Sequence, residues 1–264
     1  MVTREELNRS YKLKIMLKGP TGSGKTFSAV KFAEYVASKG WKVLYLDHEK
    51  GADEELRKLD DNILENIIRV GFKNYKQIMD ALKKHQEEQK DKLKLTIIDP
   101  MYLVEMTRLS ARDAFLEQGY YYLGEKKVEI DNKETFDLRG FMYQVATSYQ
   151  LTLLNEIVNC DQDIVATLMT PNKHDNDYDG KFSIVFEMFN AWVGNQIYYK
   201  AIPKKMRGVD LSMLPAIDNP HLKLLEAFRK KYEVIGSNNG AKSDINVDEN
   251  KEYTKPSNAE VKKA

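Results

Sequence analysis

The chain has 264 residues, of which 42% are hydrophobic and 31% are charged, enough apolar content for one large folded domain with or without a small appendage. Its 41 basic and 40 acidic residues leave a net charge of +1, so overall charge gives no indication of nucleic-acid or membrane binding. The single cysteine, Cys160, excludes an internal disulfide, and no apolar run reaches the roughly 18 residues that a membrane span requires. We therefore expect a cytoplasmic protein with no membrane partner.

Strands and helices alternate along the first part of the chain. Apolar residues recur at helical spacing over 25–38, and Gly40 is well placed to end that helix. The predicted strands are 12–18, 42–47, 66–72 and 93–99, and the predicted helices are 25–38, 53–60 and 74–90. Such alternation requires crossover connections, so it predicts a three-layer α/β fold with a mainly parallel central sheet.

The pattern is less regular after residue 106. Residues 107–135 are rich in arginine, tyrosine and acidic residues, and we interpret them as an insertion of loop and short helix. Beyond the insertion the predicted helices are 136–160, 182–194 and 220–231, and the predicted strands are 163–170, 195–202 and 232–235. Residues 236–264 are polar and we expect them to be a disordered tail, which leaves 1–235 as one domain.

The motif GPTGSGKT at 19–26 matches the phosphate-binding loop G-x-x-x-x-G-K-[ST] and lies between a predicted strand and a predicted helix. Glycines let backbone N–H groups turn towards phosphate oxygens, and the helix presents its positive end to the same anion. We expect Lys25 to reach the β- and γ-phosphates and Thr26 to ligate Mg²⁺. The predicted nucleotide-binding residues are Gly19, Pro20, Thr21, Gly22, Ser23, Gly24, Lys25, Thr26 and Phe27.

Two carboxylates complete the predicted site. Asp99 ends the apolar strand LTIID, where a second Mg²⁺-organising group of such enzymes belongs; a helix cap or turn is the alternative. Glu49, in VLYLDHEKGAD, follows another strand at the sheet edge where ligands bind, and it can orient and deprotonate a water molecule. The alternative for Glu49 is an ordinary loop carboxylate.

The order of GPTGSGKT, YLDHEKGAD and TIIDPMYLVEM resembles the RecA-like P-loop ATPase core, related to the RecA, KaiC and DnaB group. The resemblance is good over 12–106 and looser over 136–235. It implies ATP and Mg²⁺ as ligands and Glu49 as the catalytic carboxylate. The position of the family's adenine-stacking aromatic is Leu56 here, with Asp53 as a further base contact, and Thr170 or Asn172 takes the place of the γ-phosphate sensor.

The same resemblance implies a homo-oligomer, either a ring or a filament. In such assemblies basic residues of one subunit reach the neighbour's γ-phosphate, and PKKMRG at 203–208 offers Lys204, Lys205 and Arg207. We predict Lys204 or Arg207 for this catalytic role. The alternative is a solvated basic turn.

The resemblance also places the loops 107–135 and 171–183 where relatives touch single- or double-stranded DNA. The first loop has cations beside Tyr120, Tyr121 and Tyr122, which suits base stacking, but acidic residues are as frequent in it. A partner-binding or packing insertion is equally compatible. Compact RecA-like ATPases of this size occur in phages, archaeal viruses and plasmids, and the chain resembles those more than a full recombinase. If it is viral, the expected location is the host cytoplasm.

The sequence therefore favours an ATPase that hydrolyses Mg·ATP as an oligomer in DNA recombination, replication or repair. An ATP-switched protein that recruits a partner without binding DNA is the main alternative. A small-molecule kinase is a weaker alternative, because that class usually needs an arginine-rich lid and the sequence shows no clear one. A GTPase is indicated only by N-K-x-D within PNKHD at 171–175, because Asp99 is not followed by the D-x-x-G pattern.

Overall fold

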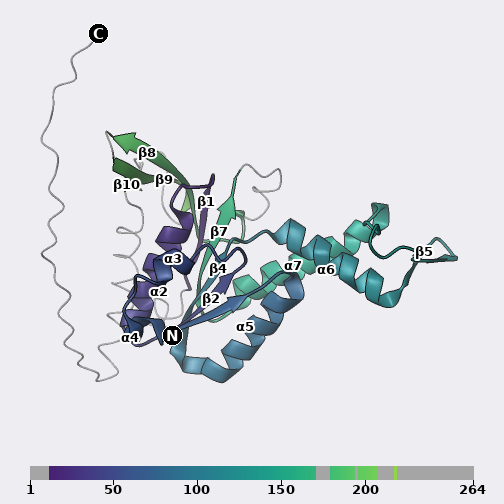
Figure 1. The fold of residues 1–264 in the computed structure, drawn as a ribbon, viewed down its shortest axis with the longest axis horizontal. Helices are drawn as coiled ribbons and strands as arrows, with labels where there is room; N and C mark the ends of the chain where they lie inside the picture. The colour runs from purple at the N-terminus through teal and green to yellow at the C-terminus, as the bar shows by residue number, and fades with distance from the viewer. Residues whose placement is uncertain (1–11, 171–178, 194–195, 207–216, 219–264) are drawn as a thin grey trace, which may run out of the picture.

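The computed structural model describes residues 12–170, 179–193, 196–206 and 217–218 (Figure 1). The predicted helix 220–231, the strand 232–235 and the polar tail 236–264 lie outside the described residues, as does most of the loop 171–183.

A mainly parallel sheet forms the centre of the molecule. Its strands are β1 (Lys14–Gly19), β2 (Lys42–Asp47), β3 (Ile67–Gly71), β4 (Leu93–Asp99), β7 (Asp163–Met169), β8 (Ile184–Val193), β9 (Gln196–Met206) and β10 (Ile217–Asp218). They are ordered β10-β9-β8-β1-β7-β4-β2-β3. Within this sheet β9 pairs antiparallel with both β8 and β10, and the other pairs are parallel. The predicted α/β class and the mainly parallel sheet are confirmed.

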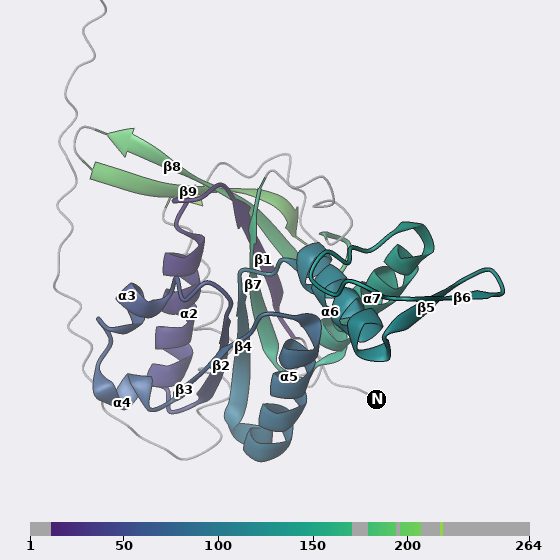
Figure 2. The ribbon, with the colours of Figure 1, turned by 45° about the vertical axis from the view of Figure 1, so that its right-hand side comes forward.

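Helices cover both faces of the sheet (Figure 2). On one face α2 (Lys25–Ser38), α3 (Asp53–Leu56) and α4 (Asp61–Leu64) lie over a core that includes Val30, Phe32 and Tyr45. On the other face α5 (Tyr75–Gln89) and α7 (Tyr143–Asn159) pack through Ile78 and Leu153. None of the described helices is long and apolar enough to cross a bilayer.

The segment between β4 and β7 projects from the domain as a lobe (Figure 1). It contains α6 (Leu103–Gln118), a hairpin of β5 (Tyr120–Leu123) and β6 (Lys126–Glu129), and a short 3-10 turn (Gly140–Met142) before α7. The prediction of loop and short helix over 107–135 was therefore wrong in detail. Helix α6 buries only a narrow stripe of residues, including Ala111, in a small separate core with Leu138 and Met142. Because most of the helix is charged or polar, its apolar periodicity is weak in the sequence.

The predicted helix 182–194 was also wrong, since Ile184–Val193 is strand β8. This strand pairs with β1 on one side and β9 on the other. Neighbouring residues such as Val185 and Phe186 are buried on opposite faces of the sheet, which removes the alternation of a half-buried strand. A short, continuously apolar segment of this kind cannot be distinguished from a helix by periodicity.

Two lysines of β1 are buried, one near each end of the strand. Lys14 Nζ donates to Cys160 O (2.9 Å), Gln162 O (2.8 Å) and Cys160 Sγ (3.1 Å). Lys18 forms an ion pair with Asp179 at 2.7 Å. These polar partners offset the desolvation of the lysines and allow β1 to occupy the middle of the sheet.

Candidate nucleotide-binding site

The GPTGSGKT segment forms the turn from β1 into α2, as predicted. Gly22 (φ 78°) and Gly24 (φ 84°) adopt the left-handed conformation that favours glycine, and Lys25 begins the helix. At Gly19 a Cβ atom would fall well inside 3.0 Å of the carbonyl oxygen of Met188 on β8. The loop is therefore a close-packed cradle of backbone whose shape depends on its glycines.

Lys25 lies inside this cradle. Its Nζ donates to Gly19 O (2.8 Å) and Pro20 O (2.7 Å) and lies 3.4 Å from Ser23 Oγ. Burial lowers the pKa of Lys25, while the nearby negative charges of Asp99 and Glu49 raise it in part. Its hydrogen-bond acceptors are all uncharged, so an anionic group in the loop would be a stronger partner than those it has.

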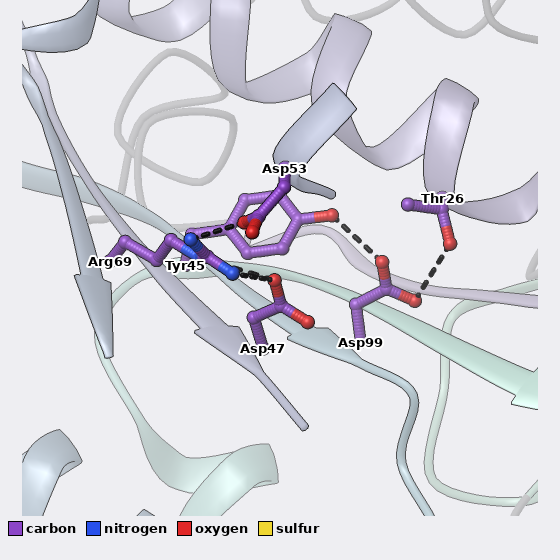
Figure 3. A network of polar contacts seen from close by, with 6 residues as sticks. All are labelled: Thr26, Tyr45, Asp47, Asp53, Arg69 and Asp99. Carbon is purple, nitrogen blue, oxygen red and sulfur yellow. Dashed lines mark hydrogen bonds and ion pairs between the residues drawn. The ribbon is translucent and has the colours of Figure 1, made fainter. Parts of the chain in front are cut away.

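Asp99 and Thr26 meet at the carboxyl end of β4 (Figure 3). Thr26 Oγ1 lies 3.3 Å from Asp99 Oδ1, Tyr45 donates to Asp99 Oδ2 at 2.8 Å, and Thr167 also donates to Oδ1. Burial raises the pKa of Asp99, and the hydrogen bonds from the three hydroxyls partly oppose this. A carboxylate and a hydroxyl held together are hard oxygen donors, which fits Mg²⁺.

Glu49 is exposed just beyond the end of β2. Its negative charge acts on both Lys25 and Tyr102, and the Tyr102 hydroxyl hydrogen-bonds to it. Burial, followed by the charge and hydrogen bond of Glu49, raises the pKa of Tyr102 to about 12. The adjoining His48 anchors the loop, since its N–H donates to Asp99 O at 2.9 Å and its Nδ1 lies 2.9 Å from Phe72 O. Glu49 thus faces the same edge of the sheet as Lys25 and Asp99.

An ionic network borders the Mg²⁺-type ligands (Figure 3). Arg69 on β3 contacts the buried Asp47 through Nη2 (2.8 Å) and Nε (3.2 Å), and it also forms an ion pair with Asp53 at the start of α3. Both ends of the loop that carries Glu49 are therefore held by one guanidinium. Asp53 is ion-paired with Arg69, and Leu56 is buried in the core at 7% exposure, so Leu56 presents no surface for a nucleobase.

The β8–β9 hairpin contacts the loop from the other side. Asn190 Nδ2 donates to Gly22 O at 3.2 Å. The ring of Tyr199 lies on Gly24, where a Cβ atom would meet its Cδ1 at 2.5 Å, and its centroid is 5.5 Å from that of Phe27. The hairpin thus shapes the loop at the end away from Glu49.

Other predicted residues have different surroundings. The Thr170 N–H donates to Gly19 O at 3.1 Å, which places Thr170 beside the loop. Lys204 pairs with Glu187 at 2.6 Å, on the part of β9 that leads away from the phosphate loop of its own subunit. Arg207 and Asn172 lie outside the described residues, as does the PNKHD segment.

Sequence reasoning missed Tyr45, Thr167, Arg69, Tyr102 and Tyr199. Tyr45 and Thr167 had a weak signal, because each is a polar group inside an otherwise apolar strand near its carboxyl end. The other three had none, since their relevance depends on which strands and loops become neighbours.

The comparisons with known proteins concern this same architecture. A family model, the type III restriction enzyme res subunit, matches residues 3–129, slightly less than half of the chain. The fold is similar to that of a KaiC-like protein from the hyperthermophilic archaeon Pyrococcus horikoshii, with a TM-score of 0.50 and 15% sequence identity over 78% of this chain and 83% of that one. The chain therefore shares the three-layer α/β fold of that KaiC-like protein. No curated protein matches the chain.

Proposed function

We propose that this P-loop NTPase binds Mg·ATP and hydrolyses it. The observation that carries the proposal is the convergence of Lys25, the Thr26–Asp99 pair and Glu49 at one edge of the sheet. Lys25 and Thr26 follow the phosphate loop, Asp99 ends β4 and Glu49 lies in the loop after β2, and each has the chemistry that its role requires.

The roles follow from these positions. Lys25 and the backbone N–H groups of the loop bind the phosphates. Thr26 and Asp99 hold the metal, which when bound neutralises charge on the triphosphate oxygens. Glu49 accepts a proton from a water molecule that it orients, and the hydroxyl of Tyr102 keeps its carboxylate in place.

Two variants test the chemistry. Lys25→Ala is expected to lose nucleotide binding, whereas Glu49→Gln is expected to bind ATP normally and to lose most turnover. Glu54→Gln is the matched control, because this carboxylate lies five residues further on and is 86% exposed. Binding is measured by calorimetry and turnover by phosphate release. Normal turnover of Glu49→Gln would show that Glu49 is not the base.

We further propose that the enzyme works as a ring or filament on single- or double-stranded DNA in recombination, replication or repair, with Lys204 or Arg207 acting on a neighbour's nucleotide. The sequence resemblance supports this step. Size-exclusion chromatography with and without ATP tests assembly, and phosphate release with and without each DNA form tests coupling. A monomer at all ATP concentrations would exclude every role in trans.

A second candidate is an ATP-switched protein that recruits a partner without DNA. The lobe favours it, because residues 107–135 contain five basic and six acidic side chains and the lobe exposes Tyr122 (54%) and Leu123 (61%). A cleft of about 380 Å³ at the root of the lobe is lined in part by Tyr102, the residue bonded to Glu49. Turnover that is unchanged by either form of DNA would favour this alternative.

A further inference from the structure

One face of the β8–β9 hairpin carries a continuous row of side chains. The antiparallel ladder pairs Met188 with Ala201, Asn190 with Tyr199, and Trp192 with Ile197. Its only irregularity lies between Val185 and Phe186, before these pairs. Because alternate residues of a strand point to the same side, the three pairs share one face of the hairpin.

The first two pairs show which way this face points. Met188 and Ala201 are buried in the core that contains the apolar face of α2. Asn190 bonds to Gly22 O, and Tyr199 packs on Gly24 and Phe27. The face therefore runs from the core, along the side of the phosphate loop, to the third pair.

The β8–β9 hairpin projects beyond the sheet, past the amino-terminal end of α2 (Figure 2), and the third pair is the last but one before its turn. Trp192 is 65% exposed and Ile197 is 45% exposed. Together with Tyr199 and Phe27 they form an apolar shelf beside the loop rather than isolated surface residues. A large aromatic side chain left open next to a phosphate cradle is suited to stacking on a flat ligand.

The two ends of the phosphate loop differ in chemistry. Asp99 and Glu49 lie at one end, and the aromatic shelf lies at the other. A nucleotide whose terminal phosphates face the carboxylates would direct its base away from them. At the positions expected from the family resemblance, Leu56 is buried and Asp53 is ion-paired with Arg69, so neither offers an open aromatic surface for a base.

We propose that the shelf formed by Phe27, Tyr199, Trp192 and Ile197 is the nucleobase-binding site, with Trp192 stacking on a purine. This inference rests on the proposed function, because a base reaches the shelf only if its phosphates occupy the loop. It assigns the β8–β9 hairpin a direct part in selecting the nucleotide.

Tryptophan fluorescence provides a direct test. The chain has two tryptophans, and Trp41 is partly buried against the core, with Lys94 Nζ 4.9 Å from its ring centroid. In a Trp41→Phe protein the emission reports on Trp192 alone. We expect ADP to quench it, whereas inorganic tripolyphosphate, which has no base, should bind the loop without quenching. The Lys25→Ala change in the same background should abolish the quenching by ADP.

Calorimetry then measures the contribution of the base. Trp192→Ala is expected to weaken ADP binding by about fivefold to a hundredfold and to leave tripolyphosphate binding unchanged, because stacking on an aromatic side chain is lost. Trp192→Phe should retain most of the affinity. Ile202→Ala is the matched control, since Ile202 is an exposed residue (39%) on the opposite face of the same hairpin.

The outcomes separate the two proposals. If ADP and tripolyphosphate both fail to bind the unmodified protein, the proposed function fails. If ADP binds but Trp192 emission does not change and Trp192→Ala binds normally, the shelf is not the base site although the function stands. Emission that changes with protein concentration and not with ADP would likewise overturn the inference and assign the shelf to a contact between copies.

Discussion

Replacing Arg69 with glutamine should destabilise the fold through Asp47. The carboxylate of Asp47 is 1% exposed, and its Oδ2 receives both contacts from Arg69. Its Oδ1 is buried and has no hydrogen-bond partner in the part of the chain that the structure describes. Removing the guanidinium would therefore leave a buried charge with little compensation.

The magnitude follows from the exposure of the two partners. Losing one partner of a fully buried ion pair costs about 3–5 kcal/mol, whereas an exposed pair contributes less than about 1 kcal/mol. The Arg69 side chain is 34% exposed, so water can reach the cavity left on its side. We expect an intermediate loss of about 2–3 kcal/mol, which lowers Tm by roughly 5–10 °C in a protein of this size.

A double-mutant cycle measures this coupling. Urea and thermal unfolding are compared for the unmodified protein, Arg69→Gln, Asp47→Asn and the double variant, with Arg57→Gln as an exposed-arginine control. The loss of unfolding free energy in the double variant should be smaller than the sum of the two single losses by at least about 1 kcal/mol. The reason is that the amide introduced by Asp47→Asn is uncharged and does not need the guanidinium as a partner. Strict additivity, or a wild-type Tm for Arg69→Gln, would refute the reasoning.

Three further changes give independent expectations. Gly19→Ala should abolish nucleotide binding and lower Tm by several degrees, since the new Cβ overlaps the backbone oxygen of Met188; a scanning-fluorimetry shift with ADP equal to that of the unmodified protein would contradict this. Asp99→Asn should make the nucleotide-free protein more stable at neutral pH. Burial raises the folded-state pKa of Asp99, so the stability that its protonated form contributes is lost as the pH rises through that pKa. Asparagine is uncharged at every pH and avoids this loss. The advantage should vanish in acid, and a pH-independent difference in Tm would count against burial as the cause. Tyr102→Phe should lower kcat about threefold to tenfold with little change in KM, because the hydrogen bond that orients Glu49 is removed; equal or faster steady-state turnover would exclude this role.

The parts of the site that lie close to strand ends were predictable from the sequence. The bounds of α2, β2 and β4 agree with the prediction to the residue. The approach of Thr26 to Asp99 follows from the same pattern, because β1 and β4 are parallel and their carboxyl ends share one edge of the sheet. Local turn chemistry and strand direction are enough to define such a cradle.

The contributions of the outer strands were not predictable. Arg69 reaches Asp47 only because β3 lies beside β2. Tyr199 reaches the phosphate loop only because β9 pairs with β8, which in turn pairs with β1. Nothing local in the sequence specifies these neighbours. Strand β8 is itself largely apolar, so its sequence does not distinguish a strand from a helix. The sheet order, rather than any single motif, determines which side chains surround the loop.

The burial of Cys160 beside Lys14 makes the thiol a probe of local opening at the junction between α7 and β7. It is the only cysteine of the chain and is 9% exposed at the junction between α7 and β7. A thiol reagent can reach it only when this junction opens, so the rate of modification under native conditions reports the free energy of that opening. Modification slowed by ADP would show that occupying the phosphate loop tightens the opposite end of β1, without any engineered label.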